Sequence, residues 1–283
     1  MSSPQNTDQL TDNNPLRHLP LLLEPEELEP LLSTPNLLIV DLSTTENYLR
    51  GHIPGAVHLP GAALQSGEEP AKGKLPDPQK LETILASIGY HPDKHIVAYD
   101  DEGGGWAGRF IWTLDCIGHL HSSYLNGGRV AWAAERRALS TEPSEPEPTS
   151  PQLQLQIAPR ADKECVLLSL KEQDTVIWDA RSPAEFHGEQ QLALRNGHIP
   201  GAINLEWTML MDPNRQLRIR EDSSKILNSL GITRDKLVIT HCQSHHRSGF
   251  TYLVAKVLGY QRLKAYDGSW SEWGNDPNTP IEQ

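Results

Sequence analysis

Residues 237–260 read LVITHCQSHHRSGFTYLVAKVLGY, a stretch that predicts a strand, a short polar loop and a helix. The β-branched run at 237–240 is typical of a buried strand, and the largely apolar run at 250–258 is typical of a buried helix. Cys242 leads the loop between them. Because the start of a helix offers unpaired backbone N–H groups and the positive end of the helix dipole, this position favours an anion such as a thiolate.

The neighbours of Cys242 decide between two interpretations of this residue. Free cysteines are commonly buried small hydrophobes. Here, however, five polar residues follow the cysteine: Gln243, Ser244, His245, His246 and Arg247. A core cysteine has no use for such a run, whereas positive or proton-donating neighbours make a thiol reactive. We therefore interpret Cys242 as a nucleophile, with the backbone N–H groups from Gln243 to Ser248 as a cradle for an anionic sulfur.

Composition limits the class of protein. A length of 283 residues predicts two domains at about 150 residues each. The net charge of −12 argues against nucleic acid or an anionic membrane as the main partner, so the basic loop is expected to serve a small anion. Neither a signal peptide nor a membrane span is predicted, and Cys116, Cys165 and Cys242 have no disulfide or zinc spacing. A cytoplasmic protein is expected.

The chain repeats itself. The hexapeptide GHIPGA occurs at 51–56 and again at 197–202, which indicates internal duplication. A stretch rich in Pro, Ser and Glu separates the copies and is typical of a linker. The predicted division is a disordered tail at 1–15, a first domain at 16–139, a linker at 140–160 and a second domain at 161–283.

The same order of elements is expected in both halves. Strands are predicted at 37–40 and 95–99, and again at 176–178 and 237–240. Helices are predicted at 44–50, 77–88 and 106–117, and again at 183–186, 221–230 and 250–258. Apolar strands that alternate with helices predict an α/β fold with a parallel sheet covered on both faces in each half. Ligands of such sheets bind beyond the carboxyl ends of the strands, which is where Cys242 lies.

Only the second half carries a thiol in its loop. An alignment without gaps, at a shift of 141 residues, places Asp101 on Cys242, Trp106 on Arg247 and Gly108 on Gly249. The first half also has Ser43 where the second half has Arg181. We therefore expect the first domain to be a scaffold or a wall of the cleft.

Taken together, these features resemble a tandem-domain rhodanese, a sulfurtransferase. The resemblance covers residues 16–283 and rests on the doubled GHIPGA, the segment DARSPAEF at 179–186, the Cys242 loop and the terminal YDGSWSEWG at 266–274. It implies a five-stranded parallel sheet flanked by helices in each half, with an aspartate in place of the cysteine in the inactive one. It also implies that the matching cysteine, Cys242, takes a sulfane sulfur from a donor, becomes a persulfide and passes the sulfur to a nucleophilic acceptor such as cyanide or a thiol.

The loop suggests the donor. It resembles a bacterial thiosulfate sulfurtransferase subgroup with a Gln, Ser or Thr, His, His, Arg loop. Arg247 and Arg181 are candidates to bind the sulfonate end of thiosulfate, because a guanidinium matches an oxyanion. For Arg181 a salt bridge with Glu185 is the alternative. His245 and His246 are expected to titrate near pH 6.5. No metal and no cofactor beyond the persulfide is predicted, and a monomer is expected.

Three other functions fit the same residues. A 3-mercaptopyruvate sulfurtransferase would use the same cysteine with another donor. A cysteine phosphatase has a similar loop from Cys242 to Arg247, but with five residues between the Cys and the Arg instead of four. A non-enzymatic persulfide carrier would relay sulfur to one protein partner without efficient turnover with cyanide.

Overall fold

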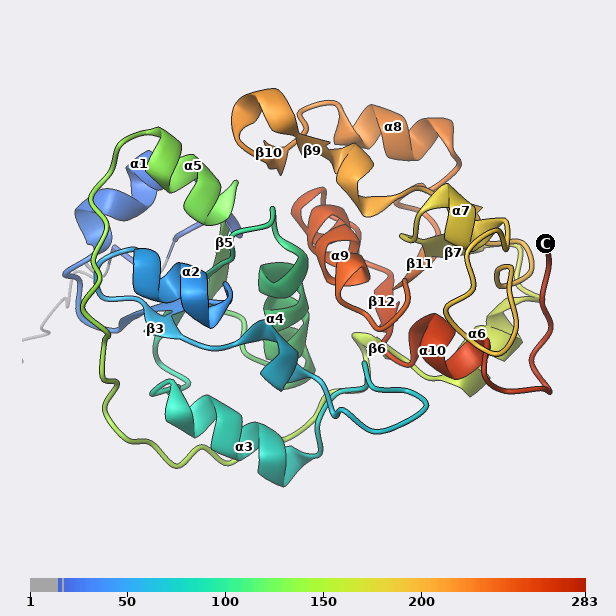
Figure 1. Ribbon diagram of the computed structural model, residues 1–283, viewed down its shortest axis with the longest axis horizontal. Helices are drawn as coiled ribbons and strands as arrows, with labels where there is room; N and C mark the ends of the chain where they lie inside the picture. The colour runs from blue at the N-terminus through green and yellow to red at the C-terminus, as the bar shows by residue number, and fades with distance from the viewer. Residues whose placement is uncertain (1–14, 17) are drawn as a thin grey trace, which may run out of the picture.

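Two five-stranded sheets, one in each half of the chain, form the frame of the molecule (Figure 1). The computed structural model describes residues 15, 16 and 18–283, so the predicted tail at 1–15 lies outside the described residues apart from Pro15. The first half contains, in chain order, β1 (Leu22–Leu23), α1 (Pro25–Leu28), η1 (Glu29–Leu31), β2 (Leu37–Asp41), α2 (Thr45–Arg50), β3 (Val57–His58), η2 (Gly61–Leu64), α3 (Pro78–Ser87), β4 (His95–Tyr99), α4 (Gly105–Cys116), β5 (Ser122–Leu125) and α5 (Gly128–Ala134).

The second half repeats this plan and adds a two-stranded hairpin. It contains β6 (Arg160–Ala161), α6 (Lys163–Ser169), β7 (Thr175–Asp179), α7 (Pro183–Phe186), β8 (Ile203–Asn204), η3 (Trp207–Leu210), β9 (Met211–Asp212), η4 (Pro213–Arg215), β10 (Arg218–Ile219), α8 (Ser223–Ser229), β11 (Leu237–His241), α9 (Arg247–Val257), β12 (Leu263–Tyr266) and α10 (Ser269–Trp273). Strands β9 and β10 form the antiparallel hairpin.

Both large sheets are parallel and have the same strand order. The order is β1-β5-β4-β2-β3 in the first half and β6-β12-β11-β7-β8 in the second. The central strands β4 and β11 are buried along almost their whole length, as their continuous apolar sequences require. This confirms the predicted α/β fold and its five-stranded parallel sheets. The polar loop after β11 therefore lies at the carboxyl end of a central strand.

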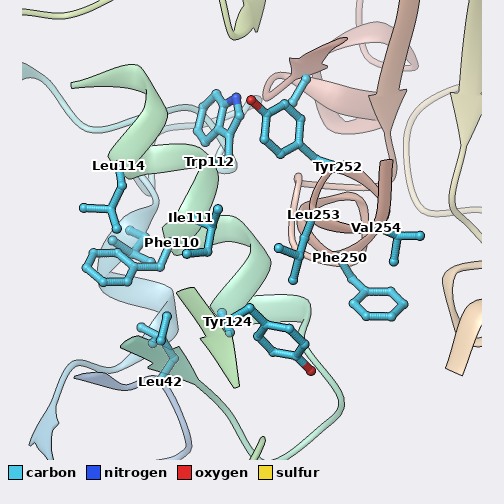
Figure 2. Close-up of a cluster of buried hydrophobic side chains, with 14 of the residues drawn as sticks. Leu42, Phe110, Ile111, Trp112, Leu114, Tyr124, Phe250, Tyr252, Leu253 and Val254 are labelled. Carbon is cyan, nitrogen blue, oxygen red and sulfur yellow. The ribbon is translucent and has the colours of Figure 1, made fainter. Parts of the chain in front are cut away.

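Helices α4 and α9 join the two halves. They run past each other in the centre of Figure 1, and their apolar side chains share one buried cluster (Figure 2). The close contact depends on Gly108 and Gly249, because a Cβ on Gly108 would lie 2.4 Å from the Gly249 carbonyl oxygen. A Cβ on Gly249 would in turn lie 2.5 Å from the Arg109 backbone nitrogen. The two sheets therefore share a core, and the loop before α9 is pressed against the first half.

The two GHIPGA copies have a structural role. In the first copy His52 stacks on Tyr48, with ring centroids 3.9 Å apart, and in the second His198 stacks on Phe186 at 3.7 Å. Gly55 and Gly201 have φ angles of +82° and +70°, a region open to glycine. The motif thus forms the turn between a short helix and the edge strand of each sheet.

The predicted linker is extended but packs on the first half. The Gln156 N–H donates to the Cys116 carbonyl at 2.6 Å, and Leu153 and Leu155 pack on the shared core. Its last predicted residue, Arg160, already belongs to β6. Helix α9 begins at Arg247, three residues earlier than the apolar run alone indicated, so the loop ends sooner than expected. No helix in the described residues is long and apolar enough to cross a membrane.

Candidate active site

Cys242 is held by backbone contacts at the end of β11. The residue is 1% exposed. Its N–H donates to Ser269 Oγ at 3.3 Å, and its carbonyl accepts the Trp270 N–H at 2.9 Å. Because Ser269 and Trp270 begin α10, the terminal segment around YDGSWSEWG fixes the cysteine in place. The sequence marked this segment as part of the resemblance but did not show its contact with Cys242.

The turn after Cys242 contains a run of backbone N–H groups. Within the described part of the chain, the backbone N–H groups of residues 243–248 have no hydrogen-bond acceptor. These groups lie in the turn that leads into α9, where the helix dipole adds to their positive potential. An anionic sulfur attached to Cys242 would therefore meet several unpaired donors.

The equivalent residue of the first half is Asp100, which corrects the alignment with Asp101. Strand β4 pairs with β2 so that Tyr99 lies opposite Asp41, and β11 pairs with β7 so that His241 lies opposite Asp179. The residue after each strand is thus Asp100 in one half and Cys242 in the other. Alignment without gaps from Gly108 and Gly249 misses this, because the first half has one residue more between the strand and that glycine.

Asp100 fills the cradle of the first half with its own carboxylate. Its Oδ1 accepts the N–H groups of Glu102, Gly103 and Gly104 at 3.2, 3.1 and 2.8 Å, and its Oδ2 accepts that of Ala107 at 2.9 Å. Burial, with the nearby Glu102 charge, raises the pKa of Asp100 to about 6. The first half therefore shows that this type of loop holds an anion.

His245 points into the protein, which corrects the expectation that it titrates near pH 6.5. The residue is fully buried, has a φ of +54°, and places Nδ1 2.7 Å from Ser248 Oγ. Its ring meets the Trp112 ring edge to face, with centroids 4.5 Å apart. Burial, and then the positive charge of Arg109, lower the pKa of His245 well below its usual range. His245 is therefore neutral at physiological pH and shapes the loop through Ser248.

His246 and Ser244 contact the first half. His246 pairs with Glu102 and stacks on Trp106, with ring centroids 4.1 Å apart. The Ser244 carbonyl accepts a hydrogen bond from Gln65 Nε2 at 2.8 Å. The first half therefore supports the loop after Cys242, and its role as a wall of a cleft stays a prediction. These three contacts across the halves had no local signal in the sequence.

Gln243 faces the other side of the loop. Its Nε2 donates to the Leu192 carbonyl at 3.0 Å. Leu192 belongs to the stretch at 187–196, which has no counterpart between α2 and the first GHIPGA. An insertion in the second half thus supports the loop from the side away from the first half.

Arg247 is bound to Glu185. It donates to both carboxylate oxygens of Glu185, at 2.6 and 2.8 Å, and Ser182 caps α7 while also donating to Glu185. Burial lowers the pKa of Arg247, but Glu185 and a Cys242 thiolate raise it by more, so the pKa lies above its usual range. Arg247 is thus a permanent cation beside Cys242, aimed by Glu185.

Arg181 lies in a separate buried pair. Its Nε lies 3.0 and 2.9 Å from the two oxygens of Asp179, and a terminal nitrogen donates to the Gly197 carbonyl at 2.9 Å. The side chain is 1% exposed and lies over the Trp270 ring, 4.4 Å from its centroid. The partner of Arg181 is therefore Asp179, not Glu185 as the alternative interpretation expected. Its contact with a donor stays a prediction.

Comparison with known proteins identifies the family of the chain. The family model for the rhodanese-like domain matches residues 24–135 and 162–276. The chain is 54% identical to thiosulfate sulfurtransferase of Pseudomonas aeruginosa over 264 residues, which cover 93% of this chain and 97% of that protein. It is 53% identical to thiosulfate sulfurtransferase of Azotobacter vinelandii, with the same coverage.

A solved structure shows the same fold at greater distance. The anaerobic ergothioneine biosynthesis enzyme from Chlorobium limicola, in complex with trimethyl histidine, superposes with a TM-score of 0.83. It is 24% identical, and the match covers 93% of this chain and 70% of that one. Two matches to one domain model, together with 54% identity over 264 aligned residues, establish the family. The chain belongs to the rhodanese family of sulfurtransferases, with two rhodanese-like domains in one polypeptide.

Proposed function

We propose that the protein transfers the sulfane sulfur of thiosulfate to a nucleophilic acceptor through a persulfide on Cys242. The observation that carries the proposal is the cradle at 243–248, which presents backbone N–H groups around a cysteine while its counterpart in the first half is filled by the Asp100 carboxylate. The two closely similar relatives named thiosulfate sulfurtransferase support the same donor.

The reaction consists of two displacements. The Cys242 thiolate attacks the outer sulfur of thiosulfate, the sulfur–sulfur bond of the donor breaks, and sulfite leaves with the bonding electron pair. The Cys242 persulfide then carries one negative charge on its outer sulfur. An acceptor such as cyanide attacks that sulfur, the persulfide bond breaks, and the Cys242 thiolate leaves as thiocyanate forms. Each step conserves charge, and neither needs an external oxidant.

The loop supplies what these steps require. Backbone N–H groups from Gln243 to Ser248 stabilise the outer sulfur of the persulfide, as oxyanion-hole donors stabilise an oxygen anion. Arg247, whose charge is fixed, attracts the sulfonate end of the donor and the departing sulfite. Ser244 and His246 hold the loop against the first half through Gln65 and Glu102. Arg181 acts indirectly. It holds Asp179, which lies opposite His241, the residue before Cys242.

Charge favours thiosulfate over 3-mercaptopyruvate. Thiosulfate is a dianion and mercaptopyruvate a monoanion, so a cation attracts the former about twice as strongly before desolvation. Glu185 offsets part of the Arg247 charge and His245 is neutral, which limits this effect. We expect kcat/KM to be about ten-fold to a hundred-fold higher for thiosulfate, with the ratio falling as salt rises.

The experiment measures kcat/KM for both donors with cyanide as acceptor. The test variant is Arg247→Gln combined with Glu185→Gln, because Arg247→Gln alone would leave a buried carboxylate without its partner. The control is Arg50→Gln, which removes an exposed arginine of the first half. The double variant is expected to lower the ratio of kcat/KM for thiosulfate to kcat/KM for mercaptopyruvate. The control should leave this ratio unchanged. Equal or better use of mercaptopyruvate by the unaltered protein would contradict thiosulfate as the preferred donor.

We further propose that the reaction needs no bound cofactor and that the protein acts as a cytoplasmic monomer. All three cysteines are free, which suits a reducing compartment. Equilibrium sedimentation should give the mass of one chain. Activity should be unchanged after extensive dialysis against a chelator. A dimer in solution, or activity that returns only with an added metal or small molecule, would contradict this proposal.

A further inference from the structure

Arg109 is a buried cation that has no acidic partner among the described residues. It lies on α4 of the first half and is fully buried. Its two terminal nitrogens donate to the carbonyls of Gly73 and Leu64, both at 2.7 Å, while its Nε has no partner in the described part of the chain. No carboxylate among the described residues lies within ion-pair distance. Its guanidinium lies over the Trp112 ring, 4.7 Å from the centroid.

Such a side chain is a poor choice for stability alone. Taking a charge out of water is expensive, and two carbonyl contacts do not offset it as a carboxylate would. Burial lowers the pKa of Arg109 to about 10, which still leaves it cationic at neutral pH. A neutral side chain of similar shape would fill the same space at lower cost, so the charge of Arg109 calls for a reason outside folding.

The surroundings of Arg109 connect it to the catalytic loop. Gly73, which accepts one of its hydrogen bonds, touches the loop: a Cβ on Gly73 would lie 2.2 Å from the Ser244 carbonyl oxygen. The Trp112 ring beneath the guanidinium meets His245 edge to face. The Arg109 backbone lies against Gly249 in the first turn of α9.

Other ionisable groups share this region. Around Arg109 they are Asp267, Arg160, Cys116 and His245, and a Cys242 thiolate also stabilises its charge. Asp267 is occupied by the Leu75 N–H at 2.9 Å and by Arg160 at 3.6 Å. Around Cys242, the cations Arg247 and Arg181 are each matched by a carboxylate, and His241, the preceding residue on β11, lies 3.6 Å from Asp179. Arg109 is thus the cation near the cysteine whose charge no carboxylate pairs with among the described residues.

We propose that Arg109 of the first half is a positioning residue for the catalytic loop of the second, holding the segment at 64–73 against Ser244 and supplying positive potential that favours the anionic forms of Cys242. The charge of Arg109 acts on Cys242 through space. Its hydrogen bonds to the carbonyls of Gly73 and Leu64 position the segment. The inference rests on the proposed function, and it gives the first half a part in catalysis although it has no nucleophile.

The experiment measures the rate of Cys242 alkylation by iodoacetamide as a function of pH, together with kcat/KM for thiosulfate. All variants carry Cys165→Ser, because Cys165 is partly exposed, whereas burial raises the pKa of Cys116 and keeps that thiol unreactive. Arg109→Met removes the charge and keeps the length. We expect the midpoint of its alkylation profile to move up by about one pH unit and kcat/KM to fall about ten-fold.

Two further variants separate the two parts of the proposal. Arg109→Lys keeps a charge but loses the forked geometry, so its alkylation midpoint should stay near that of the parent while kcat/KM falls. Arg50→Met, at an exposed arginine, is the control and should change neither quantity. A folded Arg109→Met protein with the parent's midpoint and kcat/KM would overturn the proposal. Failure of both Arg109→Met and Arg109→Gln to fold would also overturn it, since Arg109 would then serve folding.

The alkylation profile does not involve thiosulfate. Its outcome therefore stands whether or not thiosulfate proves to be the donor.

Discussion

The two halves of the molecule have the same strand order, yet the loops after their equivalent strands β4 and β11 differ in what occupies them. In the first half the Asp100 carboxylate receives four backbone N–H groups. In the second half, where Cys242 is equivalent, the corresponding N–H groups have no acceptor among the described residues. The same type of loop is thus filled by a side chain in the first half and left open to a ligand in the second.

A second difference lies beside the first. In the first half, buried Asp41 accepts hydrogen bonds from the Ser43 N–H at 2.8 Å and the Tyr99 hydroxyl at 2.6 Å, and burial raises its pKa. The equivalent Asp179 is also buried, but His241 and Arg181 outweigh this and lower its pKa. The second half therefore keeps a charged pair next to its reactive loop, where the first half has neutral partners.

Exchanging Cys242 and Asp100 should have the largest effect on activity. Cys242→Asp is expected to abolish sulfur transfer and to be at least as stable as Cys242→Ala, because its carboxylate can accept the free N–H groups at about 1.5–3 kcal/mol for a charged hydrogen bond. Asp100→Cys in the Cys242→Ala background should stay inactive. The hairpin covers that site, since a Cβ on Gly103 would lie 2.7 Å from the Met211 sulfur. Steady-state transfer to cyanide and thermal unfolding check both variants, and measurable turnover by Asp100→Cys would refute this comparison.

Arg181→Met should cause the next largest change. It leaves Asp179 buried and without its cationic partner, which typically costs about 3–5 kcal/mol in the free energy of unfolding. Ser43→Ala, at the equivalent position, should cost far less. Urea unfolding gives both values. If Arg181→Met were as stable as the parent while its KM for thiosulfate rose, Arg181 would be a donor-binding residue, as the sequence suggested, and not a structural one.

Asp100→Ala should destabilise the protein by about 2–3 kcal/mol, because it leaves buried N–H groups unsatisfied. Asp101→Ala, at the neighbouring residue, is the control and should lower the free energy of unfolding by about 1 kcal/mol or less, because it loses only the hydrogen bond from Asn47. Urea unfolding of both variants tests the equivalence of Asp100 with Cys242. A larger loss for Asp101→Ala would favour the alignment without gaps.

Glu185→Gln should have the smallest effect. Removing this negative charge leaves the Arg247 cation less compensated, so KM for thiosulfate should fall about two-fold to five-fold at low salt and less at high salt. Glu46→Gln, in the exposed pair with Arg50 of the first half, is the control. An unchanged or higher KM in Glu185→Gln would show that Glu185 aims Arg247 without limiting its charge.

The central strands, the main helices and the place of Cys242 at the end of a strand could be predicted because their signals are local. The apolar runs of β4 and β11, the polar run after Cys242 and the two GHIPGA copies each lie within a few residues. The equivalence of Asp100 could not be found by alignment without gaps, because one extra residue in the first loop changes the register only there. The inward orientation of His245 depends on its positive φ, which cannot be predicted from the residue type.

Contacts between the halves were beyond the sequence for a different reason. Gln65, Glu102 and Trp106 touch the loop only because α4 and α9 pack together, and no periodic pattern encodes contacts over such a separation. Arg109 did leave a trace, since it is one charged residue within the apolar, fully buried run of α4. A lone charge in such a helix is a signal that sequence analysis can use.

Cys242, at the open cradle, is the residue that we propose carries the transferred sulfur. The most direct test is the intact mass of the parent and of Cys242→Ala after exposure to thiosulfate and removal of the excess donor. The parent should gain the mass of one sulfur atom and lose it again on addition of cyanide, with formation of thiocyanate, while Cys242→Ala gains nothing. A gain of sulfur by Cys242→Ala, or none by the parent, would contradict the claim.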